Sequence, residues 1–164
     1  VVEILRKLMA EQIAIYKRTN VVQATTFSEK ITLLMNTYYN GLITNEEVIK
    51  ELLKTAEEIN ALRKEGEKLG LSEEELAFYD ALTKPEHIKD FYENETLIAL
   101  TRELTEMLRK NRTIDWQKKE TARAGMRKMV KRLLKKYKYP PEKREDAIET
   151  VMSQCELWTD NMTE

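Results

Sequence analysis

The residues of this sequence best suited to binding a ligand are a row of lysines and arginines between residues 119 and 136, which could bind an anionic partner. Arg127, Lys131 and Lys135 are four residues apart, so in a helix they lie along one face and repel one another by a few tenths of a kcal/mol per pair. That repulsion predicts an anionic partner for the row. The candidate surface comprises Lys119, Arg123, Arg127, Lys128, Lys131, Arg132, Lys135 and Lys136.

Three kinds of anionic partner fit this row. The first is the rest of the chain, because residues 102–144 contain 16 Lys and Arg against 5 Asp and Glu, whereas the remainder contains 12 against 24. The second is the phosphate backbone of duplex DNA, which a row of cations binds without reading the base sequence. The third is an acidic protein or a membrane surface. The membrane is disfavoured because Met126, Met129 and the leucines of this segment are needed for the core.

Groups that could catalyse a reaction are scarce. His87 and Cys155 are the only histidine and the only cysteine, which excludes a His or Cys zinc site, and Cys155 lies on an apolar helix face where cysteine packs as a small hydrophobe. The glycines at 41, 66, 70 and 125 are isolated, so they form no phosphate-binding loop. No Asp or Glu has the lysine two residues later that common metal nucleases carry. The sequence therefore predicts no catalytic residue, no metal or cofactor site and no small-molecule substrate.

The composition predicts that helices position these residues. The 164 residues include only four Gly and three Pro, and 35% are charged, which favours helices with solvated faces over a turn-rich β fold. We expect an all-α fold, a single bundle of about seven helices forming one domain over residues 1–164. No apolar run reaches the roughly 18 residues of a membrane span, and a single cysteine cannot form an internal disulfide, so the expected compartment is the cytoplasm.

Residues that cap helices indicate where the elements begin. Thr44 with Glu47, and Ser72 with Glu75, have the spacing of a capping box, and Ser28 predicts another start after a threonine-rich joint. A short turn is expected over residues 86–90. We expect helices over residues 1–18, 28–40, 45–69, 73–82, 95–110 and 116–138, and a last one that begins at Pro141.

Apolar periodicity predicts the buried faces of these helices. In the basic helix the expected buried stripe is Ala122, Met126, Met129, Val130, Leu133, Leu134 and Tyr137. In the last helix it is Ala147, Ile148, Val151, Met152, Cys155 and Trp158. In the first helix it runs through Val1, Ile4 or Leu5, Leu8, Gln12 and Ile15.

Three further residues bear on the basic helix. Asp115 can cap its first turn, and Trp116 is either a hydrophobic staple at the helix start or an anchor for a protein interface. Gly125 lies inside the helix, where glycine is up to about 1 kcal/mol less favourable than alanine. This predicts that a neighbouring helix approaches its backbone closely.

The stretch from Arg102 to Trp116, followed by Arg123, Arg127 and the paired prolines 140–141, resembles the C-terminal region of type I restriction enzyme restriction subunits of the HsdR type. The segment 75–82 is also similar to that family, and the resemblance is closest over residues 72–155. The sequence departs from the family's pattern at residues 124–126, where a bulkier helix former is expected, and at Lys138, where a glycine is expected.

This resemblance implies that the chain is the C-terminal fragment of a larger restriction subunit. Such subunits are ATP-dependent type I site-specific deoxyribonucleases, with a nuclease domain and two motor domains that translocate duplex DNA. ATP and Mg²⁺ are thus implied for the other domains and not for this chain, which is expected to have no enzymatic activity. The implied role is docking onto the modification (methyltransferase) and specificity subunits, with a contact to duplex DNA as the alternative. A stand-alone hydrolase remains a third hypothesis.

Overall fold

The computed structural model describes residues 1–111 and 120–162, and the side chains of these residues as far as Leu157. The described residues form eight helices and no strand, which confirms the all-α fold. The eighth helix is a single turn, α5, at the place where the sequence predicted only a turn. The helices are α1 (Val2–Thr19), α2 (Val21–Tyr39), α3 (Asn45–Lys68), α4 (Glu73–Thr83), α5 (Ile88–Phe91), α6 (Asn94–Asn111), α7 (Glu120–Lys136) and α8 (Pro141–Met162).

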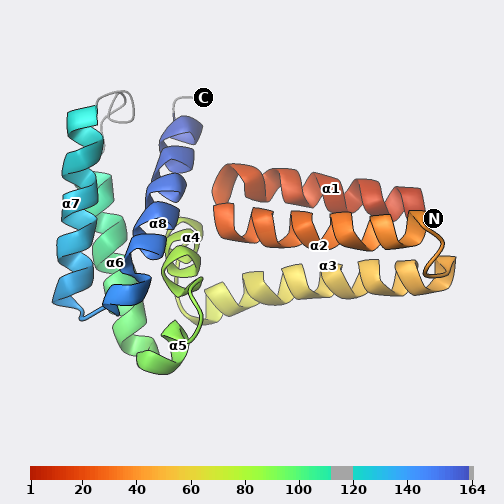
Figure 1. The fold of residues 1–164 in the computed structure, drawn as a ribbon, viewed down its shortest axis with the longest axis horizontal. Helices are drawn as coiled ribbons and strands as arrows, with labels where there is room; N and C mark the ends of the chain where they lie inside the picture. The colour runs from red at the N-terminus through yellow and green to blue at the C-terminus, as the bar shows by residue number, and fades with distance from the viewer. Residues whose placement is uncertain (112–119, 163–164) are drawn as a thin grey trace.

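Two hydrophobic cores organise these helices (Figure 1). The helices α1, α2 and α3 lie side by side and extend away from a second group formed by α4, α6, α7 and α8. The first group encloses the N-terminal core, made of Val2, Met9, Ile13, Phe27, Ile31, Met35, Val48, Leu52 and Ile59. The second encloses the C-terminal core, which includes Phe78, Leu82, Leu97, Leu100, Leu104, Val130, Leu134, Tyr139, Ile148, Val151 and Cys155.

A polar joint made of Asn20, Gln23, Asp80 and Gln154 connects the two groups of helices. The Asp80 carboxylate on α4 accepts hydrogen bonds of 2.8 Å from the side-chain amides of Asn20 and Gln23. Gln154 on α8 accepts a hydrogen bond of 2.9 Å from the backbone of α2 and donates one of 2.8 Å to the last carbonyl of α1. Because Asn20, Gln23 and Gln154 are buried, water does not compete well for these bonds. The joint therefore fixes the α1–α2 turn against both α4 and α8.

The start of α2 differs from the sequence prediction. Asn20 is the N-cap, with an extended backbone, and its side chain accepts a hydrogen bond of 3.2 Å from the backbone N–H of Gln23. Ser28, the predicted N-cap, lies inside α2. The prediction was wrong because the threonines at 25 and 26, which resemble a joint in sequence, lie on the exposed face of the helix, and one residue suffices to connect α1 to α2.

The two predicted capping boxes behave differently. At α4 the box is complete, since Ser72 accepts from the backbone of Glu75 and the Glu75 carboxylate accepts from the backbone of Ser72. At α3 the Thr44 hydroxyl caps the backbone N–H of Glu47, as predicted. The Glu47 carboxylate, however, accepts a hydrogen bond of 3.2 Å from the Thr44 hydroxyl and none from the Thr44 backbone N–H. The α3 start thus has only the hydroxyl half of the motif.

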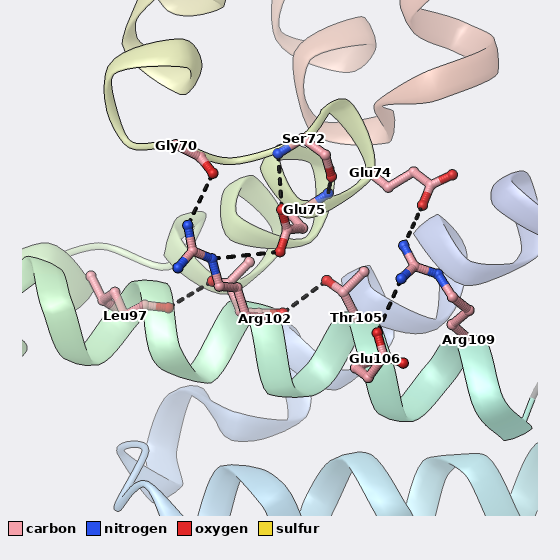
Figure 2. A network of polar contacts seen from close by, with 10 residues as sticks. Gly70, Ser72, Glu74, Glu75, Leu97, Arg102, Thr105, Glu106 and Arg109 are labelled. Atoms are coloured by element: carbon pink, nitrogen blue, oxygen red, sulfur yellow. Dashed lines mark hydrogen bonds and ion pairs between the residues drawn. The ribbon is translucent and has the colours of Figure 1, made fainter.

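Two arginines of α6 hold the connection between α3 and α4 (Figure 2). Arg102 donates a hydrogen bond of 3.0 Å to the Gly70 carbonyl and lies 3.7 Å from the Glu75 carboxylate. Further along the helix, Arg109 contacts Glu74 at 2.9 Å. These contacts tie the segment that links the two cores to the middle of the C-terminal group.

The buried face of α1 is not the one that periodicity predicted. The structure buries Val2, Met9 and Ile13, whereas Val1, Ile4, Leu8 and Ile15 of the predicted stripe are exposed. Of the predicted alternatives Ile4 and Leu5, only Leu5 packs against the N-terminal core, and it is partly buried. The helix carries apolar residues on two adjacent faces, so its period of 3.6 residues fits either of them. Only packing against α2 and α3 decides between the two faces. The predicted stripes of α7 and α8 are confirmed with two exceptions: Met129 is only half-buried and lies outside the C-terminal core, and Trp158 lies outside the described side chains.

Among the described residues, no helix makes the close approach predicted at Gly125. Gly125 is exposed, and a Cβ atom built on it meets nothing within 4 Å. The close approach occurs at Gly66 of α3 instead, where a Cβ atom would lie 2.6 Å from the Leu76 side chain of α4. The sequence alone does not distinguish the two glycines, because both lie inside helices and only one faces a neighbour.

The conformation at the end of α7 explains why a glycine is expected at position 138. Lys138 has a φ of 57°, the left-handed conformation that glycine adopts most easily. The Lys138 N–H bonds to the Lys135 carbonyl at 3.0 Å and the Tyr139 N–H to the Leu134 carbonyl at 2.9 Å, which is the Schellman pattern of a helix end. Tyr139 is then fully buried, and its hydroxyl donates a hydrogen bond of 2.6 Å to the Leu82 carbonyl.

We predict that Gly125→Ala raises the free energy of unfolding by up to about 1 kcal/mol, because alanine is the better helix former and the site is open. Urea unfolding followed by circular dichroism measures the change. Gly41→Ala is the matched control, since its site is equally open but its φ is 73°, and it should be destabilised. A loss of stability in Gly125→Ala would mean that something outside the described residues packs on this position.

The polar joint predicts a specific dependence of stability on pH. Burial raises the pKa of Asp80 to about 6, although hydrogen bonds from Asn20 and Gln23 oppose the shift. Since the folded state binds this proton more tightly than the unfolded state, the free energy of unfolding should fall as the pH rises from about 4 to above 6. Asp80→Asn keeps an oxygen acceptor without the charge, so it should remove this fall. Urea midpoints between pH 4 and pH 8 test it, and an unchanged slope in the variant would contradict it.

Candidate partner and nucleic-acid interfaces

The helix α7 presents its predicted cations around a buried face. Met126, Val130, Leu133 and Leu134 pack into the C-terminal core, so the remaining positions point toward neighbouring helices or solvent. The cations divide accordingly into those at the flanks of the helix and those opposite the core. Cations at the flanks can reach carboxylates of α6 and α8, whereas cations opposite the core face solvent.

Three cations at the flanks pair with carboxylates of the same chain. Arg123 contacts Glu156 of α8 at 2.6 Å. Arg127 contacts Glu149 of α8, and it lies 3.9 Å from a second carboxylate at 145. These pairs are largely exposed, so each contributes about 1 kcal/mol or less. The internal explanation of the basic row therefore holds for this flank.

The third paired cation, Lys136, lies on the other flank. Its ammonium group is 2.7 Å from Glu103 of α6, and the Tyr137 hydroxyl donates a hydrogen bond of 2.5 Å to the same carboxylate. Hydrogen bonds from Lys136 and Tyr137 hold the pKa of Glu103 below its usual range. The bond to Glu103 in turn raises the pKa of Tyr137 to about 12. This cluster joins α7 to α6.

Four cations opposite the core form what we call the cationic stripe: Lys128, Lys131, Arg132 and Lys135. Their spacing of three and four residues places them on one face of α7, and all four side chains are exposed. No ion pair to any of them occurs among residues 1–111 and 120–157. Like charges are thus adjacent on this face, and within the described part of the chain no ion pair offsets their repulsion.

Three of the predicted site residues lie outside the described residues. These are Lys119, Asp115 and Trp116. The roles expected of them, an extra cation, a helix cap and a staple or interface anchor, stay predictions.

A second surface, which sequence reasoning missed, lies on α1. Ile4, Leu8 and Ile15 are 65%, 51% and 52% exposed, and together with Val1 they form what we call the apolar ridge. They fall on one side of the helix because successive members are separated by three, four and seven residues. These residues were visible in the sequence as an apolar stripe, but the sequence analysis predicted that this stripe would be buried. A row of large exposed apolar side chains is typical of a surface that binds another protein.

His87 and Cys155, the only histidine and the only cysteine, lie in different surroundings. Cys155 is fully buried in the C-terminal core, whereas the side chain of His87 is 77% exposed beside Asp90, so these two residues do not form a pair. Within the described part of the chain, no three His, Cys, Asp or Glu side chains lie close enough to hold a metal ion. The helices in these ranges also include none that is long and apolar enough to cross a membrane.

Comparison with known proteins gives a family. Residues 1–161 match the family described as "Type I restriction enzyme HindI endonuclease subunit-like, C-terminal". The chain is 40% identical over 162 residues to the type I restriction enzyme HindI endonuclease subunit of Haemophilus influenzae, a match that covers 99% of this chain and 15% of that protein. It is 31% identical over 135 residues to a Methanocaldococcus jannaschii protein provisionally named as the type I restriction enzyme MjaIXP endonuclease subunit, covering 82% of this chain and 13% of that one.

The chain thus spans about a seventh of the length of these curated relatives. No solved structure matches it. A family match over nearly all residues, together with 40% identity, leaves one assignment: the chain belongs to the family of C-terminal regions of endonuclease subunits like that of the type I restriction enzyme HindI.

Proposed function

We propose that this chain is an assembly module, which docks the endonuclease subunit of a type I restriction enzyme onto its methyltransferase and specificity subunits. The observation that carries the proposal is the apolar ridge of α1. The family gives the context, because its members are regions of subunits, and a subunit must bind other chains.

The geometry of the ridge suits recognition by another protein. Ile4 and Ile15 are separated by about 16 Å along the helix axis, at a rise of about 1.5 Å per residue. A groove on a partner can take up such a row, because side chains spaced by three, four or seven residues project from one side of a helix. Each aliphatic side chain that becomes fully buried contributes on the order of 1 kcal/mol, after allowance for the part already buried here.

In this proposal the module itself carries out no catalysis. ATP and Mg²⁺ would be held by other parts of the endonuclease subunit, since the described residues offer no cluster of metal-binding side chains. The isolated glycines give no loop in which backbone amides could surround a phosphate. The cytoplasm, where such an enzyme would meet DNA, is part of the same proposal.

We expect Leu8→Glu, made in the complete endonuclease subunit, to weaken its affinity for the methyltransferase–specificity complex by about tenfold or more, because a charge would replace an apolar contact. Biolayer interferometry with the complex immobilised measures the dissociation constant. Ala14→Glu is the matched control, since it adds the same charge at an exposed position on another face of α1.

Two results would count against the proposal in different ways. If the unmodified subunit fails to bind the complex at micromolar concentrations, the docking function itself is wrong. If the unmodified subunit binds and Leu8→Glu binds equally well, docking uses another surface. ATP- or metal-dependent hydrolysis by the 164-residue chain alone would favour the hypothesis of a stand-alone hydrolase.

A further inference from the structure

We infer that the cationic stripe of α7 binds the phosphate backbone of duplex nucleic acid, independently of the docking surface on α1. The inference starts from the division of cations on α7. Arg123, Arg127 and Lys136 have carboxylate partners on α8 and α6, so acidic residues of the chain satisfy them. The four residues of the stripe have no such partner among the described residues.

The unpaired charges are concentrated rather than scattered. Lys128 with Arg132, and Lys131 with Lys135, are like-charged pairs at a spacing of four residues, and each destabilises the helix by a few tenths of a kcal/mol. The negative end of the helix dipole offsets this for Lys135, which lies in the last turn, but hardly for Lys128 or Lys131. An anion bound from outside the chain would relieve this repulsion.

The character of the surface distinguishes a nucleic acid from an acidic protein. Stable protein interfaces have an apolar centre with aromatic or aliphatic anchors. The exposed large apolar side chains of the described residues lie on α1, α2, α3 and α5 and in the α2–α3 connection, and none lies on α7. A phosphate backbone needs only point charges and hydrogen-bond donors, which long lysine and arginine side chains supply.

The dimensions of the stripe also fit a duplex. From Lys128 to Lys135 the helix rises about 10 Å, at about 1.5 Å per residue. Duplex DNA carries one phosphate per roughly 3.4 Å of axis on each strand, so three or four phosphates lie within reach of the four side chains. Side chains project little from the helix surface just before the stripe, because the exposed residues there, Thr121, Ala124 and Gly125, are small. These three residues therefore leave room for a phosphate backbone along this face of the helix.

The position of α7 keeps this surface free when α1 is occupied. In Figure 1, α7 lies at one end of the long axis of the molecule, while the N-terminal end of α1 lies at the other. A protein bound along the outer part of α1 would therefore not cover the stripe. The two surfaces differ in chemistry as well as in place, so each can be removed separately by substitution.

Fluorescence anisotropy of a labelled duplex of about 20 base pairs, titrated with the 164-residue chain between about 50 and 200 mM salt, tests the inference. We expect binding that weakens steeply with salt. Replacing Lys128, Lys131, Arg132 and Lys135 by Gln should reduce the slope of log K against log salt by roughly 3 to 4 units, because each phosphate that a cation neutralises accounts for about 0.9. Circular dichroism should show unchanged helix content, because the four side chains are exposed.

The control variant replaces Lys50, Lys54, Lys64 and Lys68 of α3 by Gln, which changes the net charge equally on an acidic helix. It should retain most of the binding and of the salt slope. Three outcomes would overturn the inference: no binding of the unmodified chain at about 50 mM salt, equal losses in the two variants, or a poly-glutamate peptide that binds as tightly as the duplex. The last would identify an acidic protein as the partner, and none of them depends on docking by α1.

Discussion

The partly buried carboxylate of Asp80 lies at the centre of the polar joint between the two groups of helices. It accepts two amide hydrogen bonds from the start of α2, and Gln154 on α8 holds the backbone of the same turn. The N-terminal and C-terminal cores are separate clusters of apolar side chains that meet only at their edges, for example where Val22 of α2 packs against the C-terminal core. Apolar contact has little directional preference, so it contributes less than hydrogen bonds to fixing the angle between the two groups. Hydrogen bonds have direction, and the burial of their donors keeps water from replacing them. The position of α1 relative to α7, and hence of one candidate surface relative to the other, depends on this joint.

Much of the fold could be predicted from the sequence because local rules determine it. Ser72 and Glu75 form the expected capping box, Pro141 begins α8, and the apolar stripe of α7 is buried as its period indicates. The start of α2 was missed for a local reason, because Asn20 caps the backbone of Gln23 and a single residue separates α1 from α2. The other two failures have a common physical cause: the buried face of α1 and the glycine that a neighbour approaches are decided by contacts between distant segments. Nothing within one helix records those contacts.

The candidate site shows the same limit. The cations of α7 are obvious in the sequence, but Arg127 and Lys131 look equivalent there, one turn apart on an apparently uniform face. In the fold Arg127 faces α8 and has a carboxylate partner, whereas Lys131 forms no ion pair with any described residue. Sequence reasoning could find the charge but not its neutralisation, because that depends on where α8 and α6 return to α7. The apolar ridge was misassigned for the related reason that exposure is a property of the packed molecule, and a residue type alone does not determine it.

The separation of the two cores has a consequence for how the molecule opens. Backbone amides exchange with solvent through local or global unfolding, and groups of amides that share a core exchange together. Because α1, α2 and α3 share one core and α6, α7 and α8 another, we expect their amides to exchange in two cooperative classes with different protection. The class with the smaller core would open first, and it contains the apolar ridge. A partner bound to this ridge would stabilise the part of the molecule that otherwise unfolds most readily. Its binding would therefore slow amide hydrogen exchange throughout α1, α2 and α3.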